Sequence, residues 1–222
     1  MSEENFVNKA LTPKNMLSVS YTLNNFTKQQ NTACTNMNNH TNKIVLVIAY
    51  LLQKEGKMNY LKIIKLIFFA DKLHIKKYWR LITDDSYYAM DKWPVASLTL
   101  NIIKEPEQLA EWLELPFTNE GYDLRVTKPI SDFDRLSEVE KETLDLIYAR
   151  FNQYDQRHLV GLTHNYIEWQ NLKQEVDVMS RAQMDIKDFF QDSENQDPIF
   201  NIPKEEVDLA KDLYLEREQY AI

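Results

Sequence analysis

The chain is poor in glycine and cysteine, and both shortages restrict what it can be. Its 222 residues include 3 glycines and 1 cysteine, Cys34. So few glycines disfavour β-barrels with many tight turns and glycine-rich loops that bind phosphate. A single cysteine excludes an internal disulfide framework and a cysteine-rich zinc module, and it is typical of a reducing compartment. Long apolar runs are also missing: the longest, residues 44–52, is far shorter than the roughly 20 residues of a membrane span.

Acidic residues outnumber basic ones, but only in the second part of the chain. The net charge is −8. Residues 1–80 contain 12 lysines and arginines against 4 acidic residues, whereas residues 81–222 contain 14 against 30. The positive first part could attract an acidic partner, but charge runs are more often solvated or satisfied internally, and we favour that interpretation. The polar start of the chain does not resemble a secretory signal, so we expect a cytoplasmic protein.

Composition divides the chain into three parts. Residues 1–40 are rich in Asn, Thr and Gln without a sustained hydrophobic period, which predicts a flexible N-terminal arm. Residues 41–175 carry helical periodicity and predict one domain. Residues 176–222 form an acidic extension, which we expect to be loosely structured up to residue 198 and to end in a helix that starts at Pro203.

Within residues 41–175 the patterns predict a mainly α domain with a small β element, an α+β fold. Residues 41–55 favour a buried helix, although their β-branched run would equally suit a strand. Ser137 and Glu140 form a capping box that begins another helix. Alternation over residues 121–127 predicts a strand, which could pair with residues 87–90.

The predicted helix over residues 59–78 carries the most information. At helical spacing one side of it presents a set of cations, here called the lysine stripe: Lys62, Lys65, Lys72, Lys76 and Arg80. Asp71 lies within the opposite apolar arc, and His74 lies at the edge of that arc. A buried carboxylate is costly unless it is paired or hydrogen-bonded, so we expect a structural network around Asp71.

The same residues also allow two functional interpretations. Asp71 and His74 are one turn apart and could act as a base and its orienting group. With His164 they could also ligate a metal, but a buried hydrogen-bond network is the commoner arrangement. Motifs of metalloproteases, serine hydrolases and phosphate-binding loops are missing from the sequence. We therefore expect no catalytic residues, no metal and no cofactor.

The sequence resembles a known family in two blocks. The first contains residues 65–74, then Tyr78, Ile82-Thr83-x-Asp85, Tyr88-Ala89-Met90 and Pro94-Val95; the second contains Leu136-Ser137, Leu162-Thr163-His164 and Trp169. In order and spacing these blocks closely resemble the Panacea domain of SocA-like antitoxins, over residues 41–170. Three positions depart from the family, which usually has glycine where this chain has Trp79, Asp84 and Trp93. Because glycine adopts positive φ easily, we expect local differences in those turns.

The resemblance implies a compact helical domain and an antitoxin of a toxin–antitoxin system, phage- or mobile-element-associated, which neutralises a cognate toxin by direct protein–protein binding. Its motif residues are expected to form a structural network: Asp71, His74, Thr83, Asp85, Thr163, His164 and Trp169. The candidate partner interface comprises Lys72, Lys76, Trp79, Arg80 and Trp93. The alternatives are a phage- or mobile-element regulatory protein, possibly associated with DNA through the lysine stripe, and an adaptor that delivers a protein to a protease.

Overall fold

The computed structural model describes residues 39–90, 93–105 and 115–220, and Thr41–Ile222 form one compact unit. The arm predicted over residues 1–40 lies almost entirely outside the described residues. Residues 39–52 are helical, as predicted for residues 41–55. The remaining elements follow in chain order as β1 (Lys57–Asn59), α2 (Tyr60–Tyr78), β2 (Tyr87–Met90), β3 (Trp93–Ala96), α3 (Ser97–Lys104), β4 (Phe117–Glu120), β5 (Asp123–Val126), α5 (Glu138–Phe151), α6 (Gln156–Thr163), α7 (Ile167–Gln170), α8 (Lys173–Met179), β6 (Arg181–Gln183), η1 (Ile186–Phe190), η2 (Pro198–Phe200) and α9 (Lys204–Tyr220).

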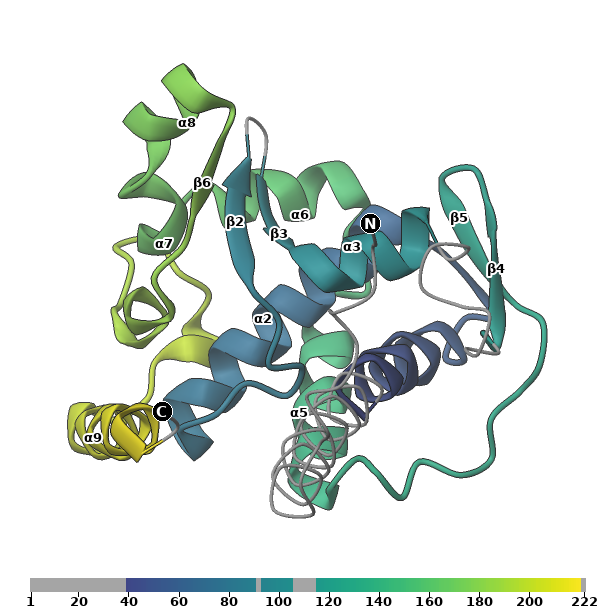
Figure 1. Cartoon of the computed structure of the whole chain (residues 1–222), viewed down its shortest axis with the longest axis horizontal. Coiled ribbons are helices and arrows are strands. Elements are labelled where there is room, and N and C mark those ends of the chain that lie inside the picture. The colour runs from purple at the N-terminus through teal and green to yellow at the C-terminus, as the bar shows by residue number, and fades with distance from the viewer. Residues whose placement is uncertain (1–38, 91–92, 106–114, 221–222) are drawn as a thin grey trace, which may run out of the picture. The chain divides into compact units, whose positions relative to one another are not determined.

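Helix α2 runs through the middle of this unit and forms its core (Figure 1). The Asn59 side chain caps its N-terminus by accepting a hydrogen bond from the Leu61 amide at 3.0 Å. Every residue from Ile63 to Lys76 is buried, so the helix is enclosed on all sides rather than amphipathic. The aromatic rings of α2 carry the packing: Phe69 stacks on Phe151 of α5, with ring centroids 4.5 Å apart.

Two small antiparallel sheets complete the fold and confirm the predicted α+β class. One has the order β1-β5-β4, with Lys57 opposite Arg125. The other has the order β3-β2-β6, with Tyr88 opposite both Val95 and Gln183. The predicted strand at residues 121–127 is present as β5, but its predicted pairing with residues 87–90 is wrong. Each of these strands instead forms a local hairpin with its neighbour in sequence, which costs less loop-closure entropy.

The segment after residue 175 is ordered, contrary to the expected loose structure over residues 176–198. Strand β6 joins β2 in the second sheet. Phe189 in η1 and Phe200 in η2 are fully buried, and Phe189 packs edge-on against Phe68 of α2 with centroids 5.5 Å apart. The final helix expected after Pro203 is present as α9. The segment is acidic overall, but its aromatic residues Phe189 and Phe200 pack into the core.

Candidate functional site

Asp71 is the centre of a buried hydrogen-bond network at the C-terminal half of α2. One carboxylate oxygen accepts hydrogen bonds from the backbone amides of Ile82, at 2.7 Å, and Thr83, at 3.1 Å. The other accepts from the Tyr87 hydroxyl, at 2.7 Å, and from the Thr83 hydroxyl. Burial raises the pKa of Asp71 to about 6, and these four donors act in the opposite direction. The carboxylate therefore fixes the loop that leads from α2 into β2.

Asp85 extends this network to the next helix. Its carboxylate accepts hydrogen bonds from the Leu98 amide at 2.9 Å, and from the amide and hydroxyl of Thr99 at 2.7 and 2.8 Å. The residue at the N-cap of α3 is Ala96, whose side chain makes no capping hydrogen bond, so Asp85 caps α3 from outside the helix. Asp85 also donates its own amide to the Thr83 hydroxyl at 3.3 Å. The motif Thr83-x-Asp85 thus connects α2 to α3.

His74 holds the C-terminal end of α2. Its Nδ1 lies 2.8 Å from the Arg80 carbonyl oxygen, which can only accept, so Nδ1 carries the proton. Nε2 is buried and has no hydrogen-bond partner among the described residues. Burial lowers the pKa of His74 to about 4, because protonating Nε2 would place an unsatisfied charged donor in the interior. His74 is therefore a neutral structural residue at pH 7.

Two of the positions where the family has glycine keep the backbone conformation that glycine favours. Trp79 ends α2 with φ 54°, and Asp84 has φ 50°. The Trp79 amide still donates to the Ile75 carbonyl at 2.9 Å, as the amide of a left-handed C-terminal cap does. The expected local differences are therefore not seen in the φ angles at these two positions. Instead, the backbone carries the strain of side chains in the left-handed region.

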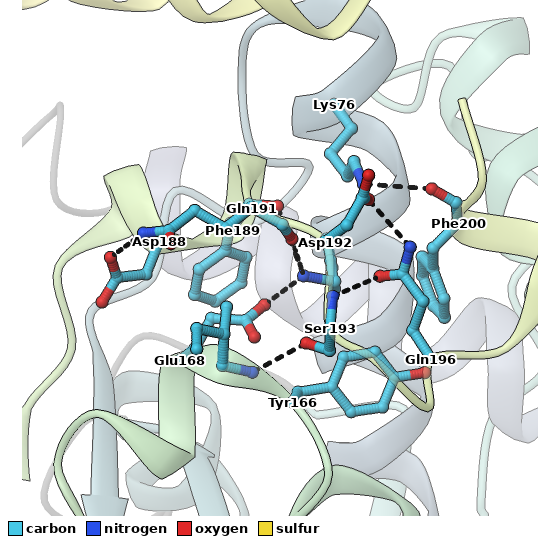
Figure 2. Close-up of polar contacts among 12 residues, drawn as sticks. Lys76, Tyr166, Glu168, Asp188, Phe189, Gln191, Asp192, Ser193, Gln196 and Phe200 are labelled. Atoms are coloured by element: carbon cyan, nitrogen blue, oxygen red, sulfur yellow. Dashed lines mark hydrogen bonds and ion pairs between the residues drawn. The ribbon is translucent and has the colours of Figure 1, made fainter. Parts of the chain in front are cut away.

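Two lysines of the lysine stripe anchor the C-terminal segment; Figure 2 labels one of them, Lys76, with its partners Asp192 and Phe200. Lys72 contacts Glu168 of α7 at 2.5 Å and donates to the carbonyls of Phe189 and Gln191, each at 3.3 Å. Burial raises the pKa of Glu168 and lowers that of Lys72, while their mutual attraction opposes both shifts. Glu168 is a core residue that the sequence predictions missed. Its position between two apolar residues, Ile167 and Trp169, is the signal in the sequence that could have found it.

Lys76 makes the second anchor. Its ammonium group lies 2.6 Å from Asp192 and donates to the Phe200 carbonyl at 3.0 Å. Both lysine side chains, which the sequence offered as candidate partner contacts, are 0% exposed and present no surface in this structure. The physical reason is that residues 186–201 of the same chain cover them, and carbonyl oxygens of η1 and η2 accept hydrogen bonds from both ammonium groups.

The rest of the lysine stripe is also hydrogen-bonded within the fold. Lys62 donates to the Asn152 carbonyl at 2.8 Å, and buried Lys65 donates to the Pro94 carbonyl at 2.7 Å. Arg80 donates to Glu140 at 2.6 Å. Glu140 also accepts from Lys43 at 2.7 Å and completes the predicted capping box with Ser137.

The second block of the resemblance packs near β2. The Thr163 hydroxyl donates to the Val160 carbonyl of its own helix at 2.8 Å. His164 stacks on Trp169 with ring centroids 4.3 Å apart, and the Trp169 indole donates to the Met90 carbonyl at 3.4 Å. Asp71 binds Tyr87 at the other end of the same strand, so the two blocks meet through β2.

Among the described residues, no group of three His, Cys, Asp or Glu residues is arranged to hold a metal ion. Nor is any described helix long and apolar enough to cross a membrane.

Comparison with known proteins gives one match. The family model for the antitoxin SocA-like Panacea domain matches residues 63–170. The comparisons with curated proteins and with solved structures gave no match. The matched range begins in α2 and ends in α7, and it contains every motif residue from Asp71 to Trp169 discussed above. Residues 63–170 of this chain are therefore similar to the Panacea domain of SocA-like antitoxins.

Proposed function

We propose that this protein is an antitoxin that binds a cognate toxin directly and neutralises it without performing chemistry. The observation that carries the proposal is the family match over residues 63–170, together with the use that the fold makes of the motif. Asp71 and Asp85 hold α2, β2 and α3 together through buried hydrogen bonds. The motif thus serves as the framework of a binding module.

The orientation of Asp71 and His74 supports a role without catalysis. A general base needs access to a substrate proton, and an orienting carboxylate must contact the imidazole. Here both side chains are 0% exposed. The Nδ1–H of His74 donates a hydrogen bond to the Arg80 carbonyl oxygen, and the carboxylate of Asp71 accepts hydrogen bonds from Tyr87 and the loop amides instead.

The surface available to a toxin differs from the one that the sequence indicated. Lys72 and Lys76 are covered by the chain itself. Trp79 is 39% exposed, Arg80 is partly exposed and Trp93 is half-buried, so these three remain candidate contact residues. DNA binding through the lysine stripe loses its support, because the stripe donates its hydrogen bonds within the fold.

Co-expression tests the proposal. Each gene that neighbours the coding sequence is induced alone and together with this protein, and growth and co-purification are measured. We expect one neighbour to arrest growth, to be rescued by this protein and to co-purify with it. Because masking leaves the toxin intact, the amount of toxin should not fall on rescue. A fall that requires a cellular protease would favour the delivery adaptor, and rescue of no neighbour would refute the antitoxin function.

A further inference from the structure

Helix α9 is attached to the rest of the fold by one of its faces. Val207 and Ala210 are buried, and the ring of Tyr214 packs against Phe190 of η1 with centroids 5.6 Å apart. These residues are spaced three and four apart, so they line one side of the helix. In Figure 1, α9 lies beside the end of α2 at the margin of the unit. The opposite side of α9 therefore has no part in the core.

Another exposed side of α9, roughly 110° around the helix axis from the buried face, carries an apolar row. Leu209 is 61% exposed, Leu213 is 36% exposed and Tyr220 is 80% exposed. At about 100° per residue, separations of four and seven place all three within a narrow arc. We call this row the α9 stripe. Three large apolar side chains in one row are a contact surface rather than the isolated exposed residues that are normal on any protein.

The borders of the α9 stripe are acidic. The same helical spacing puts Glu205 and Glu216 along one border and Glu206 along the other. All three glutamates are exposed. Arg217, which lies beyond Glu206, contacts Asp84 at 3.6 Å, so an acid already offsets its charge. The surface thus offers apolar anchors between two carboxylate borders.

We propose that the α9 stripe is the surface that docks on the toxin, and that it enters an apolar groove bordered by lysine or arginine side chains. This rests on the proposed function, because the partner is the cognate toxin of that proposal. Charge decides between the possible occupants. A second copy of the chain would bring glutamates against glutamates, in a protein whose net charge is −8, whereas a cationic border pairs with them. The apolar anchors supply the affinity, and the glutamates supply orientation and association rate.

The test is a matched pair of double variants in the full-length chain. Leu209→Lys with Leu213→Lys places two cations in the α9 stripe. Val178→Lys with Met179→Lys makes the same change at another exposed apolar site, since these residues of α8 are 84% and 72% exposed. Lysine has high helix propensity, so α9 should keep its structure. Circular dichroism and thermal unfolding verify that both variants are folded.

Affinity for the toxin identified by co-expression is then measured by calorimetry, with growth rescue in parallel. We expect the α9 variant to bind at least about tenfold more weakly and to lose rescue, and the α8 variant to match the wild type. The association rate of the wild type should also fall as salt rises. If the folded Leu209→Lys, Leu213→Lys variant binds the toxin like the wild type, the proposal is overturned while the antitoxin function stands. Equal loss in both variants would overturn it too, because the effect would not be specific to α9.

Self-association is the remaining alternative, and the same proteins test it. Analytical ultracentrifugation of the wild type and of the Leu209→Lys, Leu213→Lys variant should give the same oligomeric state. If the wild type is a dimer and the variant a monomer with unchanged toxin affinity, the α9 stripe joins two copies of this chain and the proposal is refuted. If the wild type binds no toxin at all, the proposed function itself has failed.

Discussion

Removal of the Asp71 carboxylate is the most direct test of the assignment of the family motif to structure. In Asp71→Ala, the amides of Ile82 and Thr83 and the hydroxyls of Thr83 and Tyr87 all lose their acceptor. Asp71 is 0% exposed, and a small alanine side chain supplies no acceptor in its place. In Asp71→Asn, the carbonyl oxygen can still accept from both amides, and only the hydroxyl side of the network has to rearrange.

The expected free-energy losses differ between the two variants. Each buried donor left without an acceptor costs about 1–3 kcal/mol. The two amides and two hydroxyls therefore sum to roughly 4 kcal/mol or more in Asp71→Ala, from which the relieved burial of the carboxylate subtracts a part. For Asp71→Asn we expect about 1–2 kcal/mol. Since domains have total stabilities of about 5–15 kcal/mol, Asp71→Ala is expected to be close to unfolding.

Urea unfolding monitored by fluorescence and circular dichroism measures both free energies of unfolding. The slope of that free energy against urea concentration should be the same in all variants. Tyr87→Phe, which removes one donor and leaves the carboxylate, should cost about 1–2 kcal/mol and calibrates the series. The reasoning is refuted if Asp71→Ala unfolds at the same urea concentration as the wild type. It is also refuted if Asp71→Asn keeps wild-type stability but loses toxin binding, because Asp71 would then act at a functional surface.

Three further predictions concern other parts of the fold. At position 79, where φ is 54°, we expect Trp79→Gly to be more stable than Trp79→Ala by about 1 kcal/mol, because glycine relieves left-handed strain; thermal unfolding of the two variants decides this, and equal stability would contradict it. Burial lowers the pKa of His74 to about 4, so between pH 6.5 and 4 the unfolded chain binds a proton at this residue that the folded protein does not. His74 therefore lowers the free energy of unfolding as pH falls, by at most about 3 kcal/mol. Because Asp71, with its raised pKa, contributes the opposite slope, the measurement is the stability difference between the wild type and His74→Asn across this pH range, and a difference independent of pH would contradict it. Lys72→Met should destabilise the protein by about 3–5 kcal/mol, because Glu168 would stay buried without its counter-ion, and Glu168→Gln added to it should restore a part; a double-mutant cycle in urea measures this, and additive losses would speak against the pair.

The sequence supports those features whose signal is local. Asp71 in the middle of an apolar arc indicates a buried, partnered carboxylate, and Asp71 is buried with four donors. Ser137 and Glu140, three residues apart, predict a capping box, and both of its hydrogen bonds form. In each case the signal comes from the residue and its neighbours on one helix, although the donors to Asp71 lie in the following loop and in β2.

The features that sequence analysis missed depend on distant partners. Lys72 and Lys76 are cations at regular spacing, which usually indicates a solvated helix face. Their partners are Glu168, 96 residues away, and the Phe200 carbonyl, 124 residues away. Every residue has a backbone carbonyl, so no pattern in the sequence identifies the one that accepts a hydrogen bond from a given lysine. The acidic composition around Phe189 likewise suggested loose structure, although the buried rings outweigh it.

Burial of Lys72 and Lys76 beneath residues 186–201 also has a consequence for biosynthesis. Helix α2 leaves the ribosome long before the segment that covers these lysines has been synthesised. Chains begin to fold from the N-terminus during synthesis. Until that segment is synthesised, the nascent chain presents apolar rings and two uncompensated ammonium groups to its surroundings. A premature stop before residue 186 would leave this state permanent, so quality-control proteases would meet incomplete copies as unfolded substrates. Only a chain translated through this segment covers the two lysines.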